Sequence, residues 1–365
     1  MQWHDTHLSY CLNIHPAETL DEVTRAVEKH ATRIKARVRP DAPFGLALRL
    51  SARAARELEN STPELRRRLD DLGMYVFTIN GFPYGPFHGE MVKRKVYQPD
   101  WTHPDRLEYT HRLIDILSRL LPEGVDGTIS TLPIAYGKEI PGEAIANLLE
   151  AARRCAAARR ESGHAIVLTL EPEPDCALSL PHEVLSFWDR LRGKAEPGIL
   201  DHLGLCLDTC HLACEFEDPA RTLEQIEEAG IPVPKIHLSA APIAPAGIDP
   251  EPVLGAYAEE IYLHQTRVRS AEEVKRYSDL PEALRENPGG EWRVHFHVPL
   301  HFQGNERLET TARLLKGAFF RRAVTPGRHL VVETYTFEVL PEKDEGVVSS
   351  VTKELEWVMD GFSTE

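Results

Sequence analysis

Nine short apolar runs, most of them followed by an amphipathic stretch, constrain the fold of this chain most strongly. The runs cover residues 7–14, 44–50, 74–80, 127–132, 165–171, 203–208, 234–238, 293–298 and 329–334. Helical spacing of apolar residues lies between most of them, including residues 20–36, 52–72, 105–120, 142–159 and 309–322. A strand-then-helix alternation repeated this often predicts a parallel sheet closed into a (β/α)8 TIM barrel. Because such a barrel has eight strands, one of the nine runs is expected outside it.

The whole chain, residues 1–365, is predicted to form a single TIM-barrel domain. Between residues 240 and 291 several prolines interrupt the alternation, although residues 271–277 have helical spacing. This stretch is therefore predicted to be a large insertion on the active-site face, before the last strands.

Charge and apolar patterning exclude several classes of protein. Asp and Glu number 57 against 42 for Lys and Arg, and the formal net charge of −15 disfavours general binding to nucleic acid. No run approaches the roughly 20 apolar residues that span a bilayer, and the first residues lack both a basic leader and an apolar segment. A cytoplasmic protein without a membrane span is expected.

Acid and histidine side chains recur where the later apolar runs end. They are Glu171, Asp208, His211, His237 and Glu333. The strands of an α/β barrel all open on one face, so side chains far apart in sequence can converge there. Four of these residues, Glu171, Asp208, His237 and Glu333, are predicted to hold one divalent metal ion. Their mixture of carboxylates and imidazole suits zinc or manganese.

A second group of histidines is predicted beside the first. His295 and His297 share a strand face, and His211 follows Asp208 at a strand end. Together they are expected to form a second metal site or a substrate-binding shell, which gives one or two ions in all. A single histidine is more often a hydrogen-bonded core or surface residue. For His211 and His237 the nearby acids favour a metal, because buried acids without a cation repel one another.

Substrate-binding residues are predicted around this mouth. Residues 81–89 combine glycines with aromatic side chains directly after a strand, which indicates a lid, although an ordinary surface turn is the alternative. Asn80, Tyr84 and His88 are predicted to bind substrate. Arg49 is placed with them as an anion-binding group, with an exposed ion pair as the alternative. Glu173 is either a second acid at the mouth or a solvent-facing loop acid, and the second interpretation is favoured.

Glu171, the tetrapeptide DTCH at residues 208–211, His237 and the pair Glu333-Thr334 resemble the xylose isomerase-like superfamily. That superfamily includes sugar epimerases, inosose dehydratases and endonuclease IV. The DTCH tetrapeptide and the histidine pair are most similar to endonuclease IV, in which such groups hold a zinc cluster. Endonuclease IV carries further metal-binding histidines after its early strands, where the corresponding strand ends here read Arg49-Leu50-Ser51 and Asn80-Gly81. His15 and His88, which follow early strands, are the alternative ligands.

Further stretches resemble one family within that superfamily. They are SYCLNIHP at 9–16, TINGFPYGPFHG at 78–89, HFHVPLH at 295–301 and VETYTFEVLP at 332–341. They are similar to the E component of the ebo gene cluster, a metabolite traffic protein with a sugar-isomerase-like barrel. This resemblance implies a role in metabolite traffic and protein partners from the same gene cluster.

These observations predict a metal-dependent sugar isomerase or epimerase acting on, or binding, a small polyhydroxylated or carbonyl metabolite. Glu171 and Glu333 would move the proton, and His211 would bind a substrate hydroxyl or a second ion. One alternative is a metal-dependent phosphodiester hydrolase related to endonuclease IV, with His295 and His297 on a second ion. Another is a non-catalytic component that binds or carries a metabolite.

Overall fold

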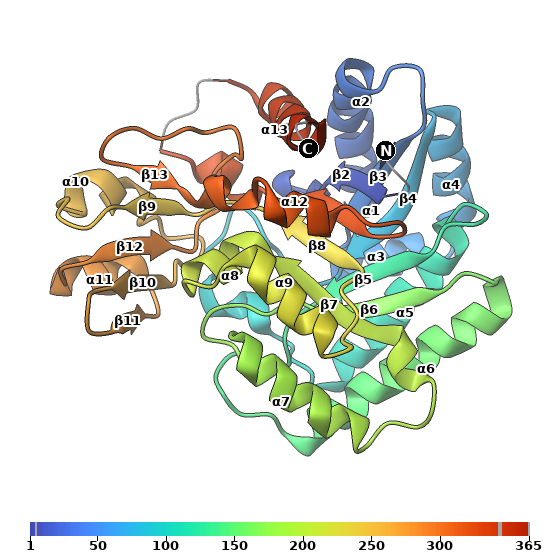
Figure 1. Cartoon of the computed structure of the whole chain (residues 1–365). Helices are drawn as coiled ribbons and strands as arrows, with labels where there is room; N and C mark the ends of the chain where they lie inside the picture. The colour runs from blue at the N-terminus through green and yellow to red at the C-terminus, as the bar shows by residue number, and fades with distance from the viewer. Residues whose placement is uncertain (4–5, 342–344, 364–365) are drawn as a thin grey trace.

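A barrel of eight parallel strands forms the centre of the computed structural model, which describes residues 1–3, 6–341 and 345–363 (Figure 1). The strands are β2 (Thr6–Tyr10), β3 (Phe44–Arg49), β4 (Met74–Asn80), β5 (Gly127–Thr131), β6 (Ile166–Leu170), β7 (Leu203–Asp208), β8 (Lys235–Leu238) and β14 (His329–Val332). They pair in the order β2-β14-β8-β7-β6-β5-β4-β3, and every pair is parallel. Each overlaps one of the predicted runs, so the predicted TIM barrel is confirmed.

Strands β2 and β3 bring the two edges of the sheet together. Cys11 forms a parallel bridge with Ala47, and Ser9 Oγ donates a hydrogen bond of 2.7 Å to the Gly45 carbonyl. A short strand, β1 (Gln2–Trp3), runs antiparallel to β2. The sheet is thus nearly closed, and the carboxyl ends of its strands face one mouth.

Helices surround the barrel because their apolar residues recur at helical spacing. α5, for example, buries Tyr109, Leu113, Ile116, Leu117 and Leu120. The outer helices are α1 (Leu20–Ala26), α2 (Thr32–Val38), α3 (Ala52–Leu58), α4 (Thr62–Asp71), α5 (Pro104–Leu120), α6 (Gly142–Ser162), α7 (Pro181–Arg192), α8 (Thr209–Cys214), α9 (Pro219–Glu228), α12 (Ala318–Ala323) and α13 (Val347–Ser363). With helices outside, strands such as β3 are buried along their whole length.

The chain leaves the barrel after β8 and builds a second sheet before it returns in β14. This antiparallel sheet has the order β11-β10-β12-β9-β13 and lies to the left of the barrel in Figure 1. Its strands are β9 (Pro242–Ala244), β10 (Thr266–Arg269), β11 (Val274–Tyr277), β12 (Glu291–Val294) and β13 (Glu309–Thr310), with α10 (Glu251–Leu254) and α11 (Leu280–Glu286) between them. The run at 293–298, which begins in β12, is the one outside the barrel. The sheet also continues beyond residue 291.

Three predicted helices differ from the structure. The helix expected over 52–72 is interrupted, because Pro63 lies in the first turn of a new helix, α4. Residues 271–277 are not helical, since β11 pairs with β10. Of residues 309–322, only those in α12 form an α-helix, because β13 pairs with β9 at the start of this stretch. The helix predictions for residues 271–277 and 309–322 are wrong because pairing with another strand, which is a tertiary contact, outweighs the helical spacing of the apolar residues.

A buried ion cluster fastens the second sheet to the barrel. The Arg267 side chain on β10 is only 1% exposed, and its Nη2 lies 2.7 Å from Asp175 Oδ1. Its Nε donates to Glu215 Oε1 at 2.8 Å, just after α8. The three groups join the insertion to two loops at the barrel mouth, so the second sheet is held beside that mouth.

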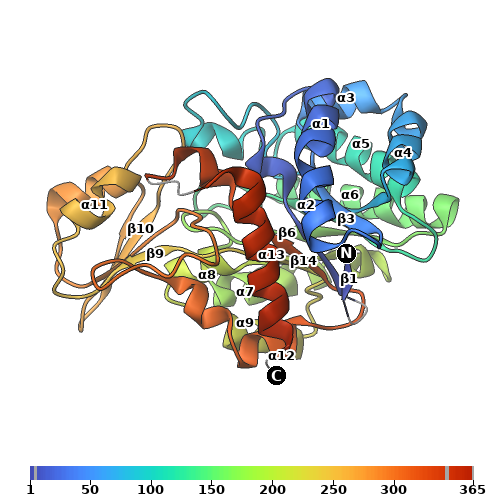
Figure 2. The same cartoon turned by 90° about the horizontal axis from the view of Figure 1, so that it is seen from above.

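The C-terminal helix α13 packs against α2, β2 and β14 (Figure 2). Within the described part of the chain, none of the helices combines the length and apolar character needed to cross a membrane.

Candidate metal centre and substrate cavity

Four side chains from four strands converge at the barrel mouth. Glu171 follows β6, Asp208 ends β7, His237 lies in β8 and Glu333 follows β14, and one ligand atom from each lies within 4.8 Å of the others. His237 Nδ1 is 2.8 Å from Glu171 Oε1 and 3.2 Å from Glu333 Oε2. Donors bound to one ion at about 2.1 Å are about 3 Å apart, so this spacing suits a shared ion. We call these four residues the metal cup.

Buried atoms of the metal cup lack hydrogen-bond partners. Glu171 Oε2 and Asp208 Oδ2 are buried and have no hydrogen-bond partner among the described residues. Buried polar atoms are normally paired, and three buried carboxylates repel one another. A divalent cation would satisfy both needs, and the donor set of three carboxylates and one imidazole fits zinc or manganese. Metal ligation by these residues stays a prediction.

The other oxygen of Asp208 is fixed by its own chain. The side chain caps α8, where Oδ1 accepts hydrogen bonds from the amides of Cys210 (2.8 Å) and His211 (3.0 Å). Ser239 Oγ donates to the same oxygen at 2.7 Å. The DTCH tetrapeptide therefore folds as a strand end followed by a helix cap, and this cap leaves Oδ2 available to an ion.

Two asparagines orient Glu333. Asn13 Nδ2 and Asn80 Nδ2 each donate to Glu333 Oε1 at 2.9 Å. Burial alone would raise the pKa of Glu333, but His237 and other nearby imidazoles outweigh it and lower this pKa. Asn80, predicted to bind substrate, thus contacts a metal-cup residue, and Asn13 is a partner that the sequence did not reveal.

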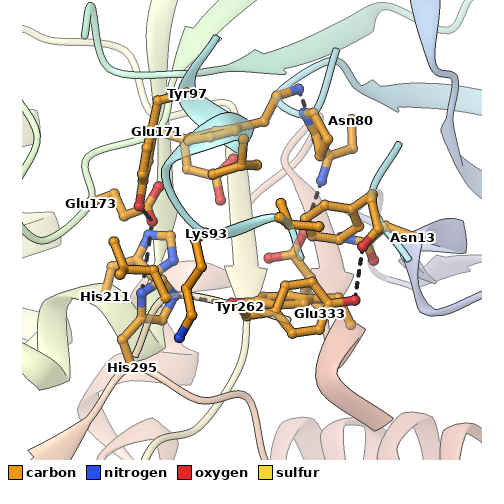
Figure 3. A pocket seen from close by; sticks show the side chains of 17 residues that line it. Asn13, Asn80, Lys93, Tyr97, Glu171, Glu173, His211, Tyr262, His295 and Glu333 are labelled. Atoms are coloured by element: carbon orange, nitrogen blue, oxygen red, sulfur yellow. Dashed lines mark hydrogen bonds and ion pairs between the residues drawn. The ribbon is translucent and has the colours of Figure 1, made fainter. Parts of the chain in front are cut away.

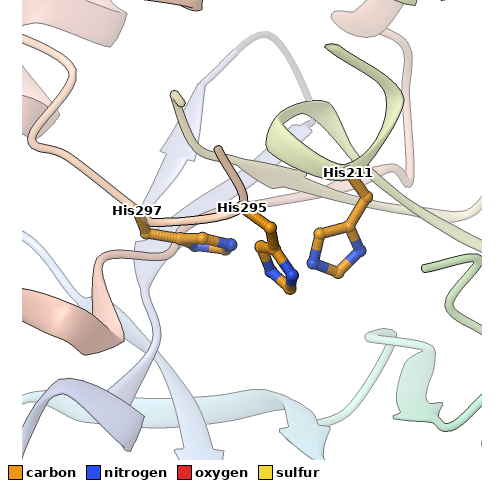
Figure 4. Close-up of side chains that lie close together, drawn as sticks. All are labelled: His211, His295 and His297. Atoms are coloured by element: carbon orange, nitrogen blue, oxygen red, sulfur yellow. The ribbon is translucent and has the colours of Figure 1, made fainter. Parts of the chain in front are cut away.

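The second predicted group also converges. Ligand atoms of His211, His295 and His297 lie within 4.8 Å of one another (Figure 4), and we call these residues the histidine triad. Each Nδ1 has an oxygen acceptor at hydrogen-bond distance. For His211 it is the Pro172 carbonyl (2.9 Å), for His295 it is Gln265 Oε1 (2.7 Å), and for His297 it is the Glu333 carbonyl (2.8 Å). Because such oxygens accept, each Nδ1 carries the proton and Nε2 is left as the possible metal donor.

The electrostatic field at His211 is strongly negative. Burial would lower the pKa of His211, but Asp208 and Glu173, followed by Glu171 and Glu333, outweigh it and raise this pKa to about 9. A position that holds a proton this tightly attracts any cation. His211 therefore shares the acidic environment of the metal cup, whereas burial and the neighbouring imidazoles lower the pKa of His295.

A cavity opens directly above the metal cup (Figure 3). Its lining includes five residues that the sequence predicts for the site: Asn80, Glu171, His211, His295 and Glu333. The other lining residues are Asn13, Phe82, Pro83, Phe87, Val92, Lys93, Val96, Tyr97, Glu173, Tyr262, Leu263 and Tyr335. Asp208, His237 and His297 are not in the lining.

Three residues predicted to bind substrate are not in this lining. Arg49 is buried, where it pairs with Glu18 Oε1 at 2.8 Å and donates to the Ala17 carbonyl at 2.8 Å. It therefore forms an internal ion pair, not the exposed one considered from the sequence. Tyr84 and His88 belong to the loop beside the cavity, and substrate contact by these three residues stays a prediction.

The predicted lid and the insertion are joined over the cavity. Tyr262 OH donates to the Phe87 carbonyl at 3.0 Å and is 3.0 Å from His88 Nδ1. The Val92 amide donates to the Ile261 carbonyl at 2.8 Å. Residues 82–97 and 261–263 thus form one roof, a feature that depends on contacts between segments far apart in the sequence.

The prediction that Glu173 faces solvent is wrong. Its side chain is buried and lines the cavity, where Oε1 accepts a hydrogen bond of 2.6 Å from Tyr97 OH. Burial raises the pKa of Glu173 to about 7 even though His211 and this hydrogen bond oppose the change. The signal in the sequence was its spacing of two residues from Glu171, but the insertion that covers it could not be placed from the sequence.

Comparison with known proteins agrees with this architecture. A xylose isomerase-like TIM barrel protein from Mycobacterium smegmatis, solved in complex with magnesium, matches with a TM-score of 0.58, 13% identity and coverage of 100% of this chain and 99% of that one. L-ribulose 3-epimerase matches with a TM-score of 0.52, 13% identity and coverage of 98% and 95%. The IOLI protein with a zinc atom matches with a TM-score of 0.50, 12% identity and coverage of 98% and 99%. At these identities the likeness concerns the fold.

No curated protein matches this sequence. A sequence profile described as "Xylose isomerase-like TIM barrel" matches residues 44–253, which is more than half of the 365 residues. The chain therefore belongs to the xylose isomerase-like TIM barrel family.

Proposed function

We propose that this protein is a metal-dependent epimerase or isomerase of a small metabolite that carries hydroxyl and carbonyl oxygens. One observation carries the proposal: Glu171 and Glu333 belong both to the metal cup and to the cavity lining. Asp208 and His237 belong only to the cup. Two carboxylates can therefore reach an ion and a substrate at once, as proton transfer beside a polarised carbonyl requires.

Each residue of the site has its own role in this reaction. A divalent ion in the metal cup would supply the charge that polarises a carbonyl oxygen. One of the two glutamates takes the proton from the carbon next to that carbonyl, and the other returns a proton from the opposite side. Asn13 and Asn80 hold Glu333 by Oε1, so its other oxygen stays directed into the metal cup. His211 binds a substrate hydroxyl or a second ion.

The relatives support the choice of chemistry. L-ribulose 3-epimerase shares the fold, and other barrels of this shape were solved with magnesium or zinc. For this chain we favour zinc or manganese, because imidazole is present among the carboxylates. One ion in the metal cup is the minimum, and a second in the histidine triad makes two.

Hydrogen exchange at carbon tests the proposal. Metal-loaded protein is incubated in D2O with a panel of ketoses and aldoses, and deuterium at the carbon beside the carbonyl is followed by NMR. Glu171→Gln and Glu333→Gln should each lose the exchange, whereas Glu356→Gln, an exposed change on α13, should keep it. Undiminished exchange in both site variants would refute the assigned roles.

The histidine triad favours a second candidate, a metal-dependent phosphodiester hydrolase. Three imidazoles with anchored Nδ1 atoms could hold a further ion, and two neighbouring ions can activate water against a phosphodiester. The net charge of −15 opposes nucleic acid as the substrate. Cleavage of abasic-site duplex DNA at low salt that disappears in Glu171→Gln would place this candidate first.

A role in metabolite traffic is compatible with the same site. The stretches that resemble the ebo-cluster E component supply Asn13, Asn80, His295, Glu333 and Tyr335, all of which line the cavity. Such a protein would bind its metabolite in the cytoplasm, with or without turnover, and pass it to partners from the same gene cluster. Ligand binding without carbon exchange or hydrolysis would favour this carrier role.

A further inference from the structure

The upper walls of the cavity differ chemically from its floor. The polar floor is formed by Glu171 and Glu333 of the metal cup with Asn13 and Asn80, and Glu173, His211 and His295 are further polar lining residues. Six apolar side chains line the walls: Phe82, Pro83, Phe87, Val92, Val96 and Leu263. Phe87, Val92, Tyr262 and Tyr335 form a small hydrophobic cluster, with Val96 packed against it, that is separate from the main core. The cavity therefore combines a polar floor with apolar walls (Figure 3).

The tyrosines of the walls offer rings rather than hydroxyls. Tyr97 OH donates to Glu173 Oε1 at 2.6 Å, and Tyr262 OH donates to the Phe87 carbonyl at 3.0 Å. Tyr335 OH faces His295 Nε2 at 3.5 Å. Because these hydroxyls are engaged within the protein, a ligand in the cavity would contact the tyrosine rings.

The lysine in the lining is likewise engaged. Lys93 Nζ lies 2.7 Å from Asp279 Oδ2 and 3.3 Å from the Glu259 carbonyl. Its charge is neutralised inside the protein, so the described residues of the lining offer no free lysine or arginine to an anionic group on the ligand. The walls suit neither a phosphate nor a sugar whose hydroxyls point in every direction, because a buried hydroxyl without a partner is costly.

We infer that the ligand is amphipathic, with two or more oxygens at one end for the metal cup and an apolar aliphatic or aromatic group at the other for the walls. The inference rests on the proposed function, since the oxygenated end needs an ion in the cup. It narrows the substrate from polyhydroxylated metabolites in general to those that carry an apolar substituent. Aromatic groups fit best, because Tyr97, Tyr262 and Tyr335 line the cavity and a ring can make offset or edge-on contacts with them.

A matched pair of hydroxamates tests the inference. Acetohydroxamate and 3-phenylpropanohydroxamate present the same two oxygens to an ion and differ only in the apolar tail. Calorimetric titration into zinc-loaded protein should show the phenyl compound binding at least about tenfold more tightly, because its ring leaves water for the walls. The measured quantity is the ratio of the two dissociation constants.

Two matched valine variants test whether the cavity wall causes the difference in affinity between the two hydroxamates. Val96 lies in the cavity wall, and Val253 is also partly buried but lies outside this cavity. Val96→Asn should bring the ratio most of the way to one, and Val253→Asn should leave it as in the wild type.

The outcomes separate this inference from the proposed function. Equal affinity for the two hydroxamates in the wild type, or an unchanged ratio in Val96→Asn, overturns the amphipathic ligand and leaves the metal cup intact. Binding of neither compound overturns both.

Discussion

Glu354 on α13 supplies a prediction about stability that needs no substrate. The side chain is fully buried, and its Oε1 accepts hydrogen bonds from Thr334 Oγ1 (2.7 Å) and the Leu300 amide (3.1 Å). Its Oε2 has no partner among the described residues. Burial raises the pKa of Glu354 from its ordinary value of 4.5 to about 7, although both hydrogen bonds oppose the change.

The sign and size of the effect follow from proton linkage. The folded state holds the proton more tightly than the unfolded state, so the associated stability is complete below pH 4.5 and is lost as the pH rises to about 7. A difference of about 2.5 pKa units corresponds to roughly 3 kcal/mol. Glu354→Gln keeps the shape and the acceptor oxygen but cannot ionise. Relative to the wild type, this variant should therefore gain roughly 3 kcal/mol between pH 4.5 and pH 8.

Urea denaturation at several pH values measures this gain. Subtracting the wild-type free energy of unfolding from that of Glu354→Gln cancels the titration of all other groups. The way this difference changes with pH therefore reports on Glu354 alone. Glu356→Gln, an exposed change on the same helix, is the control and should give a flat difference. A flat difference for Glu354→Gln as well would show that the buried carboxyl does not hold its proton.

Two further predictions concern buried cations. Arg267→Met should destabilise the protein by about 3 kcal/mol in urea, since it removes the nearest cation of the buried Glu215 and leaves only Arg276 Nε at 3.5 Å. Arg269→Met, which breaks a more exposed pair with Glu291, should cost less than about 1 kcal/mol. Equal losses would contradict the role of the buried cluster. Lys235 is buried two residues before His237 on the same face of β8, so Lys235→Met should tighten zinc binding severalfold by removing a nearby positive charge. Calorimetric titration checks this, and weaker binding than in Lys235→Arg would contradict it.

The barrel and the convergence of the four metal-cup residues could both be predicted from the sequence, and for the same reason. A strand buried on both faces is a continuous apolar run, and its end is marked by the first charged residue, as at Asp208. Since all strands of a barrel open on one face, position along each strand was enough to bring Glu171, Asp208, His237 and Glu333 together. No knowledge of the loops was needed.

The roof could not be predicted, because it depends on contacts made by the insertion. Residues 274–277 form a strand only because β10 lies beside them. The buried Glu173 is hydrogen-bonded to Tyr97, whose hydroxyl accepts a hydrogen bond from Gln265 of the insertion. Arg49 ends β3, and its pairing with Glu18 and the Ala17 carbonyl gives an internal ion pair in place of the exposed one considered from the sequence. Each of these differences arises from a partner far away in the sequence or in a loop of irregular conformation.

The most direct test of the central claim is a crystal structure of zinc-loaded protein with anomalous data collected at the zinc edge. The metal cup predicts a peak about 2.0–2.2 Å from one donor atom of each of Glu171, Asp208, His237 and Glu333. A second peak bounded by the histidine triad would make the site dinuclear. Absence of a peak among those four residues in protein that contains stoichiometric zinc would contradict the claim.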